Sequence, residues 1–141
     1  MSIARSIAPH LPYLRRFARA LEGAQTGGDA FVAETLEVLI ADPSSFPTDV
    51  APKVALYRVF VKLWSSTHRG ERPRRAGALT DSLQRNLEAL PAASRQAFLL
   101  HAMEDFSFEE VASILEVSAA ETARLLDAAL TTKLDWKVAS T

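Results

Sequence analysis

The sequence contains no cysteine among its 141 residues, and its apolar runs are short. The missing cysteine excludes disulfide bonds, thiol catalysis and cysteine-ligated zinc or iron–sulfur sites in this chain. No run approaches the ~18–20 apolar residues of a membrane span. Residues 1–9 also lack the apolar stretch, roughly 7–15 residues long, of a secretory signal. We therefore expect a soluble, cytoplasmic protein.

Clean alternation of apolar and polar residues, the pattern of a half-buried strand, is also lacking. Apolar residues recur instead at helical spacing, so the sequence predicts an all-α fold. The first expected helix has the apolar face Leu11, Leu14, Ala18 and Leu21. Gly23 follows it as a C-terminal stop. A second helix is expected to begin at the N-cap Asp29 and to end before Pro43. Its apolar face is Val32, Thr35, Leu36, Leu39 and Ile40.

The third expected helix, residues 51–65, carries two apolar stripes. One consists of Val54, Tyr57, Val61 and Trp64, and the other of Leu56, Phe60 and Leu63. A helix with apolar residues on two sides is covered on two sides, so we expect this helix to be central to the first half of the chain.

Residues 66–78 interrupt the helical pattern with four arginines, two glycines, one proline and no large apolar residue. Such a segment cannot form a core of its own. We interpret it as a flexible linker between a first lobe, residues 1–65, and a second lobe, residues 79–141. Its arginines would also suit a nucleic acid or an acidic partner. The linker interpretation is favoured, because four charges in an unstructured segment bind weakly and with strong salt dependence.

The second lobe is expected to contain a helix-turn-helix. Short helices are predicted over residues 79–90 and from Pro91 to about residue 103. Ser107-Phe-Glu-Glu110 has the pattern of a capping box, and Ser118-Ala-Ala-Glu121 repeats it. Two capped starts separated by an eight-residue helix (108–115) and a tight turn are typical of this motif. The second helix of the motif is expected to bury Thr122, Leu125, Leu126, Ala129 and Leu130.

The distribution of charge argues against DNA reading by this motif. Residues 83–141 hold five basic and nine acidic side chains, whereas the rest of the chain holds 11 basic and eight acidic ones. DNA affinity needs Lys and Arg against phosphates, and base readout needs Arg, Lys, Asn or Gln at the start of the second helix. That face offers Arg124 between Glu121 and Asp127. We interpret the motif as a way of packing helices.

Groups that support catalysis or metal binding are sparse. His10, His68 and His101 show no His-x-x-x-His spacing, and the sequence has no glycine-rich phosphate loop. Glu104 and Asp105 are neighbours in sequence, which do not face each other on a helix, so we interpret them as an ordinary charged helix end. We expect no enzymatic activity, no cofactor and no metal.

Several apolar residues lack an evident core. Val59 shares its side of the third helix with Arg58 and Lys62, Phe108 lies in a first helical turn, and Trp136 lies in the C-terminal tail. Together they suit a groove for a partner helix anchored by apolar residues.

Longer motifs resemble the extracytoplasmic-function sigma factors. LPAASRQAFLL (90–100) and EDFSFEEVASILEVS (104–118) resemble their region 4, and DAFVAETL (29–36) and LYRVF (56–60) resemble their region 2. The presumed linker falls where such factors join the two regions.

A narrower resemblance is carried by IAPHLPYLRRFARAL (7–21) and LWSS (63–66), which are similar to the sigma-like half of the PhyR family, the general stress response regulators of Alphaproteobacteria. This resemblance implies two small helical lobes and a decoy function. In PhyR-type proteins a phosphorylated receiver domain frees the sigma-like domain, which then binds the anti-sigma factor NepR and releases the true sigma factor. The expected receiver aspartate lies outside this chain, which we take to be cut at a domain boundary.

Two departures from true sigma factors favour the decoy. Glu116 stands where they usually carry glycine, and Glu121 and Asp127 replace basic residues of their second helix. The alternatives are a genuine sigma factor that binds core RNA polymerase and promoter DNA, and a protein–protein adaptor outside transcription. The residues expected to bind the partner lie on the third helix, the last two helices and the tail: Val59, Phe60, Phe108, Arg124, Leu126, Leu130 and Trp136.

Overall fold

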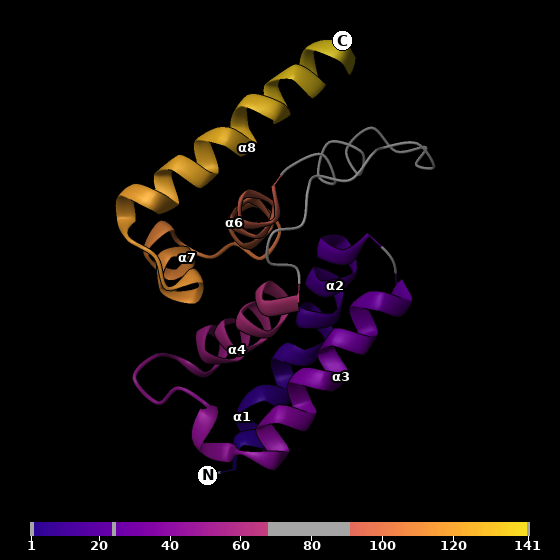
Figure 1. The fold of residues 1–141 in the computed structure, drawn as a ribbon, viewed down its shortest axis with the longest axis vertical. Coiled ribbons are helices and arrows are strands. Elements are labelled where there is room, and N and C mark those ends of the chain that lie inside the picture. Colours follow the sequence, from indigo (N-terminus) through magenta and orange to yellow (C-terminus); the bar gives the residue numbers. More distant parts are fainter. Residues whose placement is uncertain (1, 24, 68–90, 141) are drawn as a thin grey trace.

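The computed structural model describes residues 2–23, 25–67 and 91–140, the side chains of residues 25 and 130–140 excepted (Figure 1). Every regular element in these residues is a helix, which confirms the all-α prediction. None of the described helices is both long and apolar enough to cross a membrane. The expected helix over residues 79–90, and the expected linker beyond residue 67, lie outside the described residues.

The first half of the chain, residues 2–67, consists of short and long helices that pack against one another. Its elements are, in order, α1 (Ile3–Ile7), η1 (Ala8–His10), α2 (Leu11–Glu22), α3 (Gln25–Ala41), η2 (Pro43–Ser45) and α4 (Pro52–Thr67). Helix α2 ends at the predicted Gly23, whose φ of 81° is the left-handed conformation that glycine adopts without steric cost. The sequence analysis missed α1, because five residues are too few to show a helical period.

Helix α3 begins four residues earlier than predicted. It starts at Gln25, so Asp29 lies inside the helix, and the prediction of Asp29 as the N-cap was wrong. The Asp29 carboxylate accepts hydrogen bonds from the Arg19 guanidinium of α2, with N–O distances of 2.9 and 3.2 Å. A pairing between two helices therefore outweighed the local capping preference of aspartate.

Helices α2 and α3 approach each other closely at Gly28. A Cβ atom added there would lie 2.6 Å from the backbone nitrogen of Arg19 and 2.8 Å from the carbonyl carbon of Ala18. Non-bonded atoms do not approach so closely, and both neighbours belong to the backbone of α2. The helix crossing therefore requires glycine at this position.

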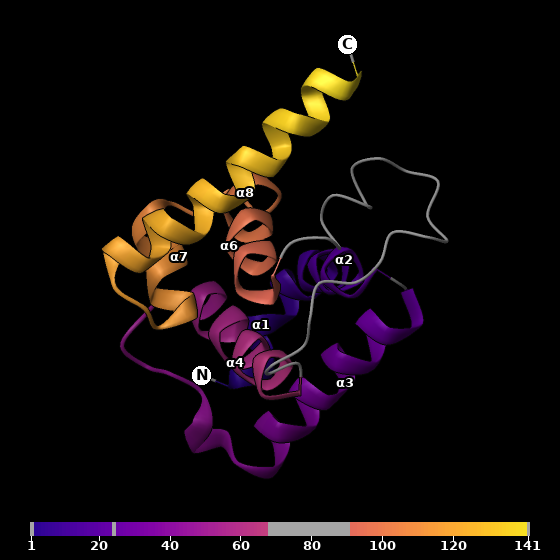
Figure 2. The ribbon, with the colours of Figure 1, turned by 45° about the horizontal axis from the view of Figure 1, so that its top comes forward.

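Helix α4 is central, as its two apolar stripes predict. Every stripe residue except the partly exposed Leu63 is buried. The Phe17 ring of α2 packs against Tyr57 of one stripe and Phe60 of the other, at centroid distances of 5.4 and 5.8 Å. Helix α4 also contacts α7 (Phe108–Leu115) of the second half (Figure 2).

The second half consists of α6 (Ala92–Ala102), α7 and α8 (Ala119–Ser140) as far as it is described. Helix α7 has the predicted bounds, and its capping box is complete. The Glu110 amide donates to the Ser107 hydroxyl over 3.1 Å, and the Ser107 amide donates to the Glu110 carboxylate over 2.9 Å. The helix ends at Glu116, which has a φ of 56° although it is not glycine.

The second predicted capping box is only half formed. The Glu121 amide donates to the Ser118 hydroxyl over 3.1 Å. The Glu121 carboxylate, however, pairs with the Arg124 guanidinium one turn further along α8 and makes no bond to the cap. A charged partner at i+3 competed successfully for this carboxylate.

A single apolar cluster runs through both halves of the molecule. It joins side chains of α2 and α4 to those of α6, α7 and α8, among them Phe17, Trp64, Leu100, Ile114 and Leu125. The two halves are therefore packed on each other in this structure (Figures 1 and 2). The division into two lobes with a flexible linker stays a prediction.

The close approach at Gly28 predicts that Gly28→Ala lowers the free energy of unfolding by about 1–3 kcal/mol, the usual range for overpacking. Gly27→Ala is the matched control, because its Cβ meets the movable Glu22 side chain at 3.1 Å. The control should be neutral or gain up to ~1 kcal/mol of helix propensity. Urea denaturation measures both, and equal stabilities would contradict the close approach.

The left-handed conformation of Glu116 predicts that Glu116→Gly stabilises the protein by about 1 kcal/mol, because glycine carries no Cβ penalty there. The matched control is Glu37→Gly at an exposed position in the middle of α3. This substitution should lower the free energy of unfolding by about 1 kcal/mol. Thermal denaturation should therefore shift in opposite directions for the two variants, and a shift in the same direction would contradict the prediction.

Candidate partner-binding surface

The two halves meet around a buried carboxylate. Glu104 follows α6, and its side chain is fully buried. The Tyr57 hydroxyl of α4 donates to it over 2.5 Å, and the Arg16 guanidinium of α2 lies 3.1 Å away. Burial, with the hydrogen bond to Glu104, raises the pKa of Tyr57 far above its ordinary value, so this hydroxyl stays protonated and remains a donor. The expectation of an ordinary charged helix end was wrong for Glu104.

Further polar contacts join the halves on either side of Glu104. The Arg58 guanidinium of α4 donates to the backbone oxygen of Ser113 over 3.1 Å and to its hydroxyl over 2.7 Å. Arg95 of α6 is buried, donates to the Leu21 oxygen over 3.1 Å and lies against the Trp64 ring. Together with the Glu104 contacts they define what we call the junction. Its direct side-chain bonds specify one arrangement of the halves.

The predicted partner-binding residues have unequal access to solvent. Phe60 is fully buried and belongs to the core in this structure, and its part in partner binding stays a prediction. Val59 and Leu126 are half-buried and pack against the core. Phe108 is half-buried but is not part of the apolar cluster of the described residues. Of these four residues, Phe108 is therefore the one that does not pack against the core cluster.

The remaining predicted residues are Arg124, Leu130 and Trp136. Arg124 is exposed, and its guanidinium pairs with the Glu121 carboxylate. That hydrogen bond holds the pKa of Glu121 below its ordinary value, so both groups are charged at neutral pH and offset each other. The side chains of Leu130 and Trp136 lie outside the described residues.

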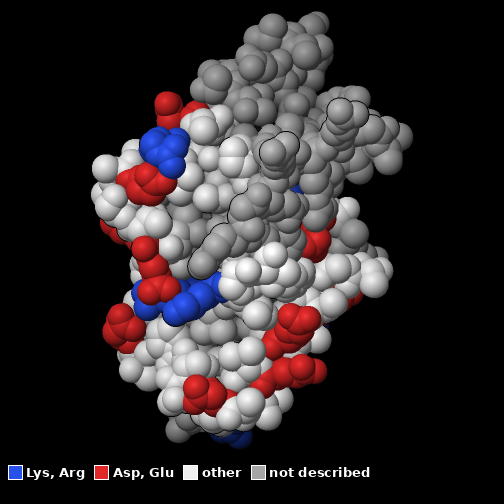
Figure 3. Space-filling view, viewed as in Figure 1, with Lys and Arg blue, Asp and Glu red and all other residues white. Residues whose placement is uncertain are grey.

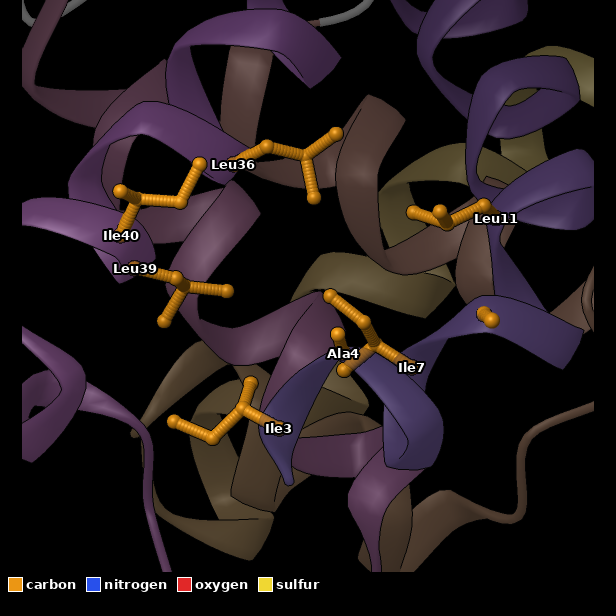
Figure 4. A pocket seen from close by; sticks show the side chains of 8 residues that line it. Ile3, Ala4, Ile7, Leu11, Leu36, Leu39 and Ile40 are labelled. Atoms are coloured by element: carbon orange, nitrogen blue, oxygen red, sulfur yellow. The ribbon is translucent and has the colours of Figure 1, made fainter.

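The surface also has hollows that the sequence analysis did not identify. An apolar pocket of about 370 Å³ opens between α1, the start of α2 and the end of α3, and Figure 4 shows the side chains around it. Ile40 stands at this pocket and is 79% exposed, so its predicted place on a buried face was wrong. Ile3 and Ile7, which line the pocket, lie on α1, a helix too short to show a period in the sequence.

A second hollow, of about 240 Å³, lies where the halves meet. The segment before α4 and its first turns contribute Val50, Ala51 and Val54, and α7 contributes Glu109, Glu110 and Ser113. Neither hollow is lined by a predicted partner-binding residue. On the face drawn in Figure 3, basic side chains gather over α4, with acidic ones towards α7 and along α3.

The described residues offer no group of three or more His, Asp or Glu that would hold a metal ion. Glu104, the buried carboxylate, is engaged by Tyr57 and Arg16 and holds the two halves together. The expected absence of enzymatic activity stays a prediction.

Two family models match the chain. The Sigma2 domain of PhyR matches residues 7–61, and the sigma-like domain of the response regulator PhyR matches residues 87–132. Among curated proteins, the phyllosphere-induced regulator PhyR of Methylorubrum extorquens is 39% identical over 135 residues. That match covers 92% of this chain and 48% of the relative, so the chain spans about half the length of the curated relative.

Two solved structures resemble the whole described arrangement. The anti-anti-sigma factor PhyR of Bartonella quintana, crystallised with the anti-sigma factor NepR, is 39% identical with a TM-score of 0.79, over 91% of this chain and 48% of that one. The sigma-like domain in the PhyR–NepR complex of Sphingomonas sp. Fr1 is 42% identical with a TM-score of 0.73. This match covers 94% of this chain and 87% of that chain.

The buried carboxylate predicts that Tyr57→Phe lowers the free energy of unfolding by about 1.5–3 kcal/mol, the usual value of a hydrogen bond to a charged group. Tyr13→Phe is the matched control, because Tyr13 is half exposed and the loss of its hydroxyl should change stability by less than about 0.5 kcal/mol. Guanidinium denaturation of the two variants distinguishes these outcomes, and a Tyr57→Phe protein as stable as the control would contradict the role assigned to Glu104.

Proposed function

The chain belongs to the PhyR sigma-like family, and from this premise we propose that it is a sigma-factor mimic that binds a NepR-type anti-sigma factor. By occupying the anti-sigma factor it would release the true sigma factor for general stress transcription. The observation that carries the proposal is the similarity of both halves, in sequence and in arrangement, to PhyR domains that were solved in complex with NepR.

The helix-turn-helix supports mimicry over promoter binding. Among the described side chains of α8, Arg124 is the sole Lys or Arg, and its charge is offset by Glu121. Base readout in the major groove and phosphate contacts both need free cationic or amide donors at this helix start. A decoy needs the surface that the anti-sigma factor grips, and it does not need those donors.

The partner surface is proposed to lie on α4, α7 and α8, the helices that carry the partner-binding residues predicted from the sequence. Phe108 is its best-supported anchor, because its half-buried ring lies in the first turn of α7 and outside the core cluster. Large aromatic residues of this kind carry a disproportionate share of binding energy at interfaces. Val59 and Leu126 remain candidates, but they pack against the core, so their loss would also disturb folding.

Charge is proposed to speed the encounter with a basic partner. Residues 83–141 hold five basic and nine acidic side chains, and complementary charge raises association rates more than affinity. Control by a phosphorylated receiver domain, which the resemblance implies, stays a prediction for the whole protein.

A binding experiment tests the proposal at Phe108. Phe108→Ser should weaken the complex with a purified NepR-type protein by about tenfold or more, which corresponds to ~1.4 kcal/mol. Glu121→Arg, the control on the helix-turn-helix, should change affinity by less than about threefold. Isothermal titration calorimetry measures both, and circular dichroism checks that each variant is folded.

Separate mixtures with core RNA polymerase and a promoter fragment test the alternative. We expect no promoter-specific transcription and no tight promoter binding at physiological salt. If transcription occurred while the NepR-type protein failed to bind, the chain would be a genuine sigma factor and the proposal would be wrong.

A further inference from the structure

Lys53 in the first turn of α4 occupies an unusual place for a lysine. It is half-buried, and its ammonium nitrogen lies 4.9 Å from the ring centroid of Phe106, 5.6 Å from that of Tyr13 and 6.0 Å from that of Tyr57. The three rings come from α2, from α4 and from the segment between α6 and α7. The ammonium is thus held at the junction by rings of both halves.

The rings satisfy only part of what an ammonium group needs. Lysine has three N–H donors and no acceptor, and ring faces are weaker partners than a carboxylate. Among the described residues, no carboxylate lies within ion-pair distance of Lys53, whereas Arg19, Arg58 and Arg124 each have one. Lysines without such a partner are ordinary on a fully solvated surface, but Lys53 is partly withdrawn from water.

Neighbouring charges leave a net positive charge at this point of the junction. Arg16 lies over the same Tyr13 ring, at 5.5 Å from its centroid, and is offset by the buried Glu104. Among the described residues, no carboxylate pairs with Lys53 in this way. Burial, with the positive charge of Lys53, lowers the pKa of His10, so this imidazole senses the unbalanced ammonium.

We propose that Lys53, with Tyr13 beside it, is an anchor site for a single carboxylate side chain of a partner protein. The site goes beyond the proposed function, because it depends on the local charge and geometry and on no particular partner. Tyr13 is 50% exposed and Lys53 is only partly buried, so both side chains are open to solvent and to a partner. An aspartate or glutamate with a flanking apolar residue satisfies both the ammonium and the ring.

Charge balance selects a carboxylate over a phosphate. Arg16 is paired with Glu104, and a single carboxylate supplies the counter-charge that no described residue provides to Lys53 within ion-pair distance. A phosphate monoester carries about −1.5 to −2 at neutral pH and would leave uncompensated negative charge beside the buried Glu104. Because Phe106 helps to hold Lys53, the carboxylate would contact a site that exists when the two halves are packed together.

The test compares two short peptides on the intact chain by NMR. Acetyl-Leu-Glu-Leu-amide should bind about threefold more tightly than acetyl-Leu-Gln-Leu-amide, which is the effect of one exposed ion pair. The shifts of the Tyr13 ring report the binding. The preference should vanish in 1 M NaCl, where the Debye length falls to ~3 Å. Equal binding of the two peptides at low salt would overturn the proposal.

Two variants locate the effect. Lys53→Met keeps an unbranched apolar side chain against the rings and should abolish the preference for the Glu peptide. Lys62→Met, on the exposed side of the same helix, should leave the preference unchanged. The pKa of His10, followed by its imidazole resonances, should rise in Lys53→Met and stay constant in Lys62→Met. A preference that survives Lys53→Met, or a His10 pKa that does not move, would show that Lys53 is not the anchor.

Discussion

Helix α4 imposes the constraint on which the rest of the structure depends. It carries apolar side chains on two sides, and burying a large apolar side chain contributes about 1.5–3 kcal/mol. Helices α2 and α3 cover part of this apolar surface, with Phe17 against Tyr57 of one stripe and Phe60 of the other. The rest of it stays exposed unless the second half packs onto it. The continuous apolar cluster through both halves is the consequence of this arrangement.

Apolar burial alone would leave the relative orientation of the halves poorly specified, and the polar groups of the junction supply that specification. Because the Glu104 carboxylate is buried, the halves can pack only in an orientation in which Tyr57 and Arg16 donate hydrogen bonds to it. Breaking such a group from its partners is costly, although its net contribution to stability is modest. The hydrogen bonds from Arg58 to Ser113 and from Arg95 to the Leu21 oxygen restrict the relative orientation of the halves further. A surface that extends over both halves, as a mimic of a two-region factor requires, is thereby presented in one geometry.

The charges on the described part of the helix-turn-helix differ from those that a DNA-binding factor needs. The helix-turn-helix is intact in its backbone, with a complete capping box at α7 and a left-handed turn at Glu116. Among the side chains of α8 that are described, residues 119–129, Arg124 is the one cation, and it is neutralised by Glu121 within the same helix. Lys53, which has no carboxylate partner among the described residues, lies elsewhere, at the junction. Both observations are consistent with the proposed role in binding a protein.

The amino-acid sequence by itself determined the helical class, the bounds of α7, the stop at Gly23 and the two-sided burial of α4. These features follow from spacing, caps and composition within one or two helical turns. Only the tertiary structure decided that Asp29 pairs with Arg19, that Phe60 is core and Ile40 is exposed, and that Glu104 is buried at a junction. These features depend on how different helices pack; the partner of Glu104, for example, is Tyr57 of α4, 47 residues away. Residue type and periodicity carry no information on which distant side chain that partner is.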